Sequence, residues 1–180
     1  SLSVAQADAK SSSKPLYLNI SEEKGITLPV PMMNIINGGE HANNKIDIQE
    51  FMIMPIAANS IAEACQMGSE IYHALKKEIN QRGLSTAVGD EGGFAPELKS
   101  THQTLDIILE AINTSGLSAG KDIFIALDCA ATEYFDGVHY KLSGEGLLLT
   151  PNQNVECLEN LVSSYPIISI EDGMAEDDWE

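Results

Sequence analysis

Four acidic residues recur along the chain at intervals close to the length of one β/α unit. They are Glu50, Glu91, Asp128 and Glu171, separated by 41, 37 and 43 residues. Each lies in or just after a short apolar run, and segments with helical apolar spacing lie between the runs. Strands that are apolar on both faces and alternate with helices predict a mainly parallel sheet. Because parallel strands end at one edge, we expect the four carboxylates to converge there.

Apolar periodicity and helix caps assign the remaining elements. The pattern predicts strands at residues 32–36, 46–54, 86–88, 123–127 and 166–170, with helices at 60–82, 100–116 and from 150 onward. Ser60, Ser100 and Thr150 are the expected N-caps. In the last helix, the residues expected to face the core are Val155, Leu158, Leu161 and Val162.

The first 30 residues have a different pattern from the rest. They combine an Ala- and Ser-rich helical segment at 1–10, an extended stretch at 15–17 and a loop that closes at Pro29 and Pro31. We interpret residues 1–30 as the end of a preceding domain with its linker, and residues 31–180 as the first part of a β/α barrel. A closed eightfold barrel needs about 250 residues, so we expect the chain to be part of a longer protein.

The charge of the chain limits its partners. It has 27 acidic and 10 basic residues, a formal net charge of −17, and Arg82 is its single arginine. Such a large negative charge repels phosphodiester backbones and acidic lipids, so nucleic-acid and membrane partners are not expected.

Three cysteines are too few for a disulfide framework and favour a reducing, cytoplasmic setting. No apolar run is long enough for a transmembrane helix.

Converging carboxylates need a cation or a proton to offset their repulsion. Asp128 and Glu171 are predicted ligands of a hard cation, and Mg²⁺ is favoured because no Cys–His cluster competes for it. Glu50 and Glu91 are then the predicted acid/base pair, and apolar neighbours should raise the pKa of Glu50. Each acid alone could equally be solvated or cap a helix, and the common register of all four is what indicates a site.

Two glycine-rich stretches are expected at the same edge. Residues 38–41 (GGEH) and 92–94 (GGF) suit hinged lids, although ordinary tight turns have the same composition. His41 lies on such a loop, and we interpret the other three histidines as structural. The residues therefore indicate Mg²⁺-dependent acid/base chemistry on a small oxyanionic substrate, without identifying that substrate.

Five longer motifs carry a family resemblance. They are residues 34–44 (NIINGGEHANN), 47–52 (DIQEFM), 88–93 (VGDEGG), 127–130 (LDCA) and 169–173 (SIEDG). Together they resemble the enolase family, in its bacterial form, and the resemblance extends over essentially the whole chain. It implies reversible, Mg²⁺-dependent dehydration of 2-phosphoglycerate to phosphoenolpyruvate in glycolysis. It also implies a cytoplasmic protein that is a homodimer or a higher homo-oligomer.

The resemblance implies a role for each site residue. Asp128 and Glu171 correspond to two of the three carboxylate ligands of the tightly bound Mg²⁺. Glu91 corresponds to the general acid that assists departure of the 3-hydroxyl group, and Glu50 supports it and contacts substrate. Gln49 and His41 match substrate-contacting positions, with His41 on a loop that closes over the site and excludes water.

Other parts of the family site have no match within these 180 residues. They are the third metal carboxylate, the Lys base and the phosphate-binding Arg, for which Arg82 does not substitute. We therefore expect the chain alone to be inactive. Two alternatives are a non-catalytic structural or interaction segment and another enolase-superfamily enzyme. A mandelate-racemase-like or muconate-cycloisomerase-like member would carry a Lys-x-Lys pair, which the sequence lacks.

Overall fold

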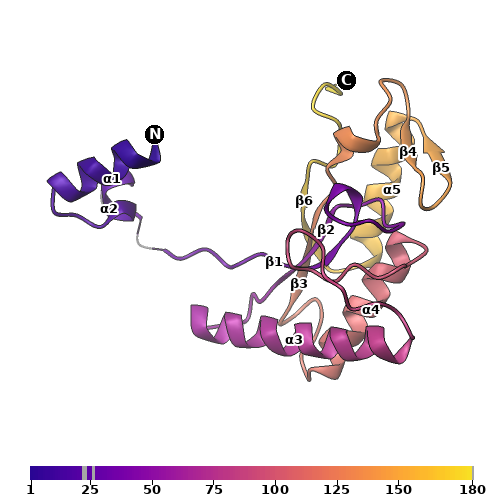
Figure 1. The fold of residues 1–180 in the computed structure, drawn as a ribbon, viewed down its shortest axis with the longest axis horizontal. Helices are drawn as coiled ribbons and strands as arrows, with labels where there is room; N and C mark the ends of the chain where they lie inside the picture. The colour runs from indigo at the N-terminus through magenta and orange to yellow at the C-terminus, as the bar shows by residue number, and fades with distance from the viewer. Residues whose placement is uncertain (22–23, 26, 180) are drawn as a thin grey trace.

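The computed structural model describes residues 1–21, 24–25 and 27–179. Its first two helices, α1 (Leu2–Ser11) and α2 (Leu16–Ile20), stand apart from the main body of the protein (Figure 1). The expected extended stretch at residues 15–17 is therefore wrong. Pro15 is the N-cap of α2, a position next to the first turn where the missing N–H of proline removes no helical hydrogen bond.

Four strands form the central sheet. They are β1 (Met33–Asn37), β2 (Glu50–Met54), β3 (Phe124–Asp128) and β6 (Ile167–Glu171), in the spatial order β1-β2-β3-β6. β3 and β6 are parallel, whereas β2 is antiparallel to both β1 and β3. Three strands therefore share one direction, and β2 is the exception.

The reversal of β2 corrects the expected place of Glu50. This residue begins β2 and does not end a strand, and residues 46–49 precede the strand. Between β1 and β2 the chain forms only the 3₁₀ turn η1 (Gly39–His41), with no crossover helix. A return without a crossover makes neighbouring strands antiparallel. Glu50 still reaches the edge where β1 and β3 end, because it starts from that edge.

Three helices pack beside the sheet, each with the predicted serine or threonine N-cap. They are α3 (Ile61–Gln81), α4 (Thr101–Thr114) and α5 (Pro151–Ser164). The hydroxyl groups of Ser60, Ser100 and Thr150 accept hydrogen bonds from the main-chain N–H groups three residues later. The strand expected at residues 86–88 is absent, and only a single bridge joins Val88 to Phe94.

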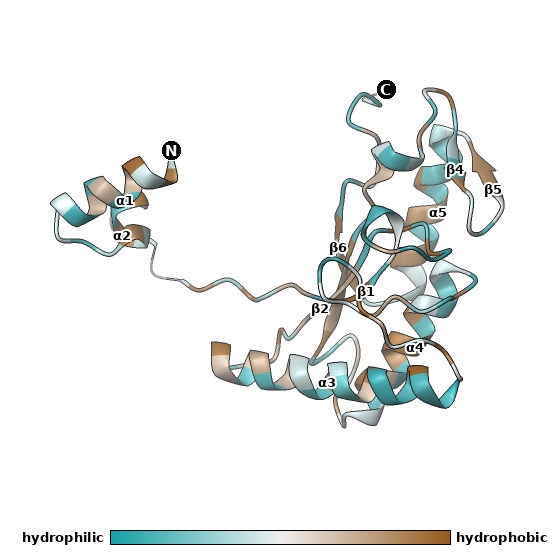
Figure 2. Ribbon diagram, viewed as in Figure 1, coloured by the Kyte–Doolittle hydropathy of each residue, from teal (hydrophilic) through white to brown (hydrophobic). Residues whose placement is uncertain are grey.

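The core lies between the sheet, α3 and α4. Figure 2 shows the central strands mostly in brown, the colour of hydrophobic residues, and the helices with hydrophilic patches. The core side chains have almost no exposed surface; among them are Ile53, Ile71, Leu75, Leu105, Ile112 and Leu127. This packing fixes the strands and thereby the edge at which they end.

The inward face of α5 differs from the predicted one. Leu161 is buried, but Val155 and Val162 are 49% and 46% exposed. Asn154 is buried instead, and its amide donates a hydrogen bond to a main-chain carbonyl oxygen after β6 (3.0 Å). Val155 and Val162 line a hollow at the surface beside β6, together with Ile170.

A small hairpin lies between β3 and α5. It consists of β4 (Tyr140–Leu142) and β5 (Leu147–Leu149), preceded by the 3₁₀ turn η2 (Ala131–Tyr134). Tyr140 is fully buried, and its hydroxyl group donates to Asp178 (2.6 Å). No helix in the described part of the chain is long and apolar enough to cross a membrane.

Candidate active site

A row of polar residues crosses the sheet at the edge where β1, β3 and β6 end. Asn37 pairs with Glu50, Glu50 with Asp128, and Asp128 with Glu171. Residues that are directly opposite on neighbouring strands place their side chains on the same face. Three of the four predicted acids therefore meet in one row, and we call Asn37, Glu50, Asp128 and Glu171 the acid row.

Glu91 reaches the same region from a loop. Two main-chain hydrogen bonds hold this loop beside β1. In one, Asn37 N–H donates to the Phe94 carbonyl oxygen (2.9 Å), and in the other Asp90 N–H donates to the His41 carbonyl oxygen (3.0 Å). The side chain of Glu91 is exposed. The loop therefore brings a carboxyl group that is open to solvent to the end of the sheet.

The acids influence one another electrostatically. Burial raises the pKa of Glu50 above its ordinary value, and repulsion by Asp128, Glu91 and Glu171 raises it further, while His41 opposes the increase. The predicted direction of this shift is confirmed. Because Glu50 interacts with three other carboxyl groups, it binds a proton more easily here than it would in water.

Besides Glu50, the other two predicted substrate-contacting residues lie against the acid row. Nδ1 of His41 is 3.1 Å from Oε1 of Glu50, in an orientation that makes no hydrogen bond. Nε2 of Gln49 donates to Oδ2 of Asp128 (3.3 Å). The structure therefore places His41 and Gln49 beside two different members of the row.

Asp128 and Glu171 have the chemistry of hard-cation ligands. They lie in register on adjacent parallel strands, and carboxylate oxygens are the protein groups that Mg²⁺ prefers. The other oxygen of Asp128 accepts a hydrogen bond from Ala130 N–H (3.0 Å), which orients the carboxylate. The described residues contain no group of three or more Asp, Glu, His or Cys that could hold a metal ion. Two carboxylates in register can supply part of the coordination sphere of Mg²⁺.

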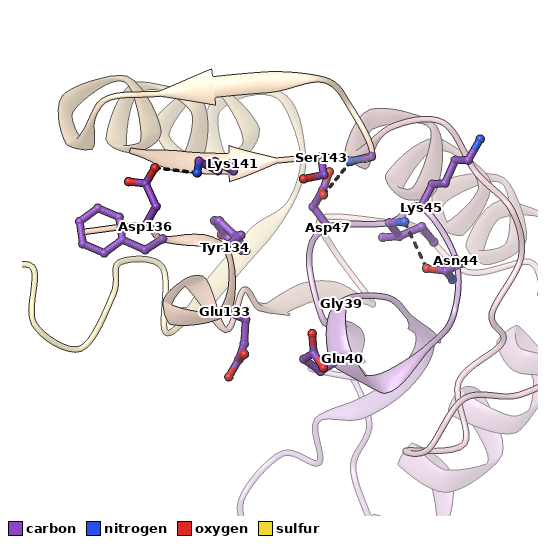
Figure 3. A pocket seen from close by; sticks show the side chains of 13 residues that line it. Gly39, Glu40, Asn44, Lys45, Asp47, Glu133, Tyr134, Asp136, Lys141 and Ser143 are labelled. Atoms are coloured by element: carbon purple, nitrogen blue, oxygen red, sulfur yellow. Dashed lines mark hydrogen bonds and ion pairs between the residues drawn. The ribbon is translucent and has the colours of Figure 1, made fainter. Parts of the chain in front are cut away.

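A cavity of about 670 Å³ lies beside this region, between the segment after β1 and the segment around η2 and β4 (Figure 3). None of the six predicted site residues lines it. Glu40 and Glu133 lie on facing elements, and Lys141 is paired with Asp136 (2.8 Å). Carboxylates outnumber lysines in its lining, four to two, so the cavity does not suit an anionic substrate.

Asn37 is the member of the row that sequence reasoning missed as a site residue. The sequence places it in an Asn-Gly-Gly turn, whose composition is that of many surface turns. In the structure it is fully buried and ends β1. The available signal was its position directly after an apolar strand, equivalent to that of the strand-end acids.

The model of the family "Enolase, C-terminal TIM barrel domain" matches residues 25–180. The match includes the whole central sheet, the three packed helices and the acid row. It leaves out α1 and α2, which stand apart from the body in Figure 1.

Proposed function

Because the chain belongs to the enolase family, through the C-terminal TIM barrel domain, we propose that it supplies catalytic residues to a bacterial-type enolase. The proposed reaction is the reversible dehydration of 2-phosphoglycerate to phosphoenolpyruvate in glycolysis. One observation supports this most directly: Glu50, Asp128 and Glu171 lie in register at one sheet edge, and the charge of Glu91 acts on Glu50.

Glu91 is the proton donor in this proposal. Loss of the 3-hydroxyl group requires a proton on the departing oxygen, and a carboxylic acid within hydrogen-bond reach can supply it. Burial and neighbouring carboxylates, Glu91 among them, raise the pKa of Glu50, so this carboxyl group binds a proton more readily than a free one. His41, beside Glu50, contacts the substrate from the turn after β1.

Asp128 and Glu171 would hold Mg²⁺, the cation on which enolase-superfamily domains generally depend. When bound, the ion supplies positive charge beside the carboxylate of the substrate. Gln49 and the N–H group of Ala130 each donate to one oxygen of Asp128 and keep that carboxylate oriented. In our proposal the third metal carboxylate, the Lys base for the C2 proton and the phosphate-binding Arg lie in a longer protein of which this chain is part.

The test uses the intact protein and separates the two chemical steps. The variant Glu91→Gln is nearly isosteric but has no transferable proton, so dehydration should fall by about 10²-fold or more. Exchange of the C2 hydrogen with solvent deuterium should persist, since that step needs only the base and the metal. Proton NMR of 2-phosphoglycerate in deuterated buffer measures both rates in one sample.

Glu97→Gln is the matched control, because Glu97 is an exposed acid close to Glu91 in sequence. It should leave both rates unchanged. Parallel loss of exchange and dehydration in Glu91→Gln would show that Glu91 serves the first step or the metal. An unmodified intact protein that forms no phosphoenolpyruvate with Mg²⁺ present would contradict the proposed reaction itself.

We also propose that the intact protein is cytoplasmic and forms a homodimer or a larger homo-oligomer, with residues 1–30 ending a preceding domain. The family resemblance supports these proposals. Light scattering of the purified intact protein measures its molar mass in solution, and the mass of a monomer would contradict the proposed assembly.

A further inference from the structure

Asn37 holds a buried amide that is not paired. It is 0% exposed, and neither its Nδ2 nor its Oδ1 has a hydrogen-bond partner among the residues that the structure describes. Buried amide groups are nearly always hydrogen-bonded, because an unpaired one loses its contacts with water without replacement. The amide of Asn37 therefore adds no hydrogen bond to the fold, and the reason for this side chain lies in the space that it fills.

The surroundings of Asn37 suggest that reason. Its side chain lies against both ends of the loop that carries Glu91, residues 89–93, which we call the Glu91 loop. A Cβ atom built on Gly89 would lie 2.8 Å from Cβ of Asn37, and one built on Gly93 would lie 2.7 Å from its Oδ1. Contacts this close require glycine in the loop. The loop is therefore packed directly onto the Asn37 side chain.

Two hydrogen bonds hold the main chain of Asn37 in place. Its N–H group donates to the Phe94 carbonyl oxygen, and its carbonyl oxygen accepts from Nδ2 of Asn44, both at 2.9 Å. On the loop, the hydroxyl group of Tyr72 donates to the Gly92 carbonyl oxygen (2.9 Å). The Glu91 loop is thus held by Tyr72 and by a fixed Asn37.

On the other side, Asn37 lies in register with Glu50. The residue therefore has Glu50 opposite it on β2 and the Glu91 loop packed against its side chain. A neutral amide fills this space without adding a further negative charge to the acid row. Proton transfer requires donor and acceptor within about 2.6–3.2 Å of each other, and a misplacement of about 1 Å can lower a rate about 10²-fold.

Resting on the proposed function, we propose that Asn37 is a positioning residue: its side chain holds the Glu91 loop so that Glu91 meets the departing hydroxyl group beside Glu50. The proposal concerns the shape and place of the side chain, and Asn37 takes no part in the proton transfer. It deepens the proposed function by naming what sets the position of the proton donor.

The first experiment needs no substrate. Hydrogen exchange by mass spectrometry, on the intact protein, follows the peptide that covers residues 86–94. Within it, Gly89 N–H donates to the Gly93 carbonyl oxygen and Asp90 N–H to that of His41. In Asn37→Ala these amides should exchange about 10-fold faster. Equal protection in Asn37→Ala and the unmodified protein would overturn the proposal.

Asn34→Ala is the matched control. Asn34 lies on the same strand, and the amide of its side chain is likewise buried without a partner, but it is in register with Met52. Its truncation should leave exchange in the Glu91 loop unchanged. Equally fast loop exchange in both alanine variants would assign the effect to loosening of β1 and overturn a specific role of Asn37.

The second experiment measures the two chemical steps by proton NMR of 2-phosphoglycerate in deuterated buffer. In Asn37→Ala, dehydration should fall by about 10²-fold, while C2 hydrogen exchange persists. A purely structural loss would lower both rates together, and that result would overturn the proposal. If the unmodified protein shows neither reaction, the proposed function fails, and the hydrogen-exchange result still decides whether Asn37 holds the loop.

Asn37→Leu keeps the test decisive if the alanine variant does not fold. Leucine has a similar branched shape without polar atoms, so the loop should keep its protection and dehydration should remain close to that of the unmodified protein. Retained protection with lost dehydration would mean that the amide contacts the reacting groups directly. That outcome would overturn a positioning role.

Discussion

β2 and β3 take part in two regions of the molecule that differ in how completely their groups are paired. On one face, Phe51, Ile53 and Leu127 are fully buried in an apolar cluster with α3 and α4. At the edge, Glu50 and Asp128 stand opposite each other as like charges. The same two strands therefore contribute to the stable core and also hold two carboxylates whose repulsion lowers the stability of the fold.

The distribution of unpaired polar atoms sharpens this difference. Within the described residues, every buried side-chain nitrogen or oxygen without a hydrogen-bond partner belongs to Asn34, Asn37 or His41. All three lie in β1 or in the turn that follows it. Unfavourable features that persist at one place of a stable fold are characteristic of functional sites. The stability of the core therefore offsets the repulsion and the unpaired polar groups at the edge of the sheet.

The largest expected effect lies in the acid row. Asp128→Asn or Glu171→Gln in the intact protein should weaken Mg²⁺ binding and lower C2 hydrogen exchange by about 10³-fold or more, since a neutral amide lacks the charge that a hard cation requires. Calorimetric Mg²⁺ titration and deuterium exchange measure the two effects. Glu156→Gln, an exposed acid on α5, is the control. Unchanged Mg²⁺ affinity in both variants of the acid row would show that Mg²⁺ does not bind at this edge of the sheet.

The next effect tests the other region. Leu105→Ala in α4 removes a fully buried side chain from the apolar cluster and should lower the free energy of unfolding by about 2–5 kcal/mol. Urea denaturation measures this change. The ratio of C2 exchange to dehydration should stay constant, because the acid row is untouched. A changed ratio would break the separation between the two regions.

The helices and caps were predictable because their signals are local. Ser60 and Ser100 cap their helices as expected, since the pattern depends on residues three positions apart. The direction of β2 was not predictable in this way. Apolar alternation is the same for a strand that runs in either direction. The direction of β2 follows only from the absence of a crossover helix in residues 38–49, which makes β2 antiparallel to β1.

The candidate site was predictable in part for a related reason. Asp128 and Glu171 end parallel strands, so their meeting follows from the β/α spacing. Glu50 lies at the beginning of a strand that runs in the opposite direction, and the spacing of the acids along the chain does not indicate that direction. Asn37 carries no charge and precedes two glycines, so its composition is that of a turn. Its burial and its contacts with the Glu91 loop depend on tertiary structure alone.

The smallest expected effect lies where the two regions meet. Glu50 is the acid whose pKa is raised, first by burial and then by repulsion from Asp128. Its pKa in the folded protein is therefore above the ordinary value of 4.5 that it has in the unfolded chain. Between these two values the folded protein binds more protons than the unfolded chain, so the free energy of unfolding falls as the pH rises through that window.

Glu50→Gln removes this ionisation and nearly preserves the shape of the side chain. At pH 7, with Mg²⁺ chelated, the variant should be more stable by about 0.5–1 kcal/mol, the size of repulsion between partly exposed charges. The gain should shrink as the pH falls toward and below 4.5, because Glu50 then becomes protonated in both states. Urea denaturation between pH 4 and 8 measures the difference, with the exposed Glu70→Gln as control. A variant that is less stable than the unmodified protein at pH 7 would show that Glu50 stabilises the fold. The acid row would then stabilise the fold as the core does, because favourable contacts such as that between Glu50 and His41 would outweigh the repulsion between its carboxylates.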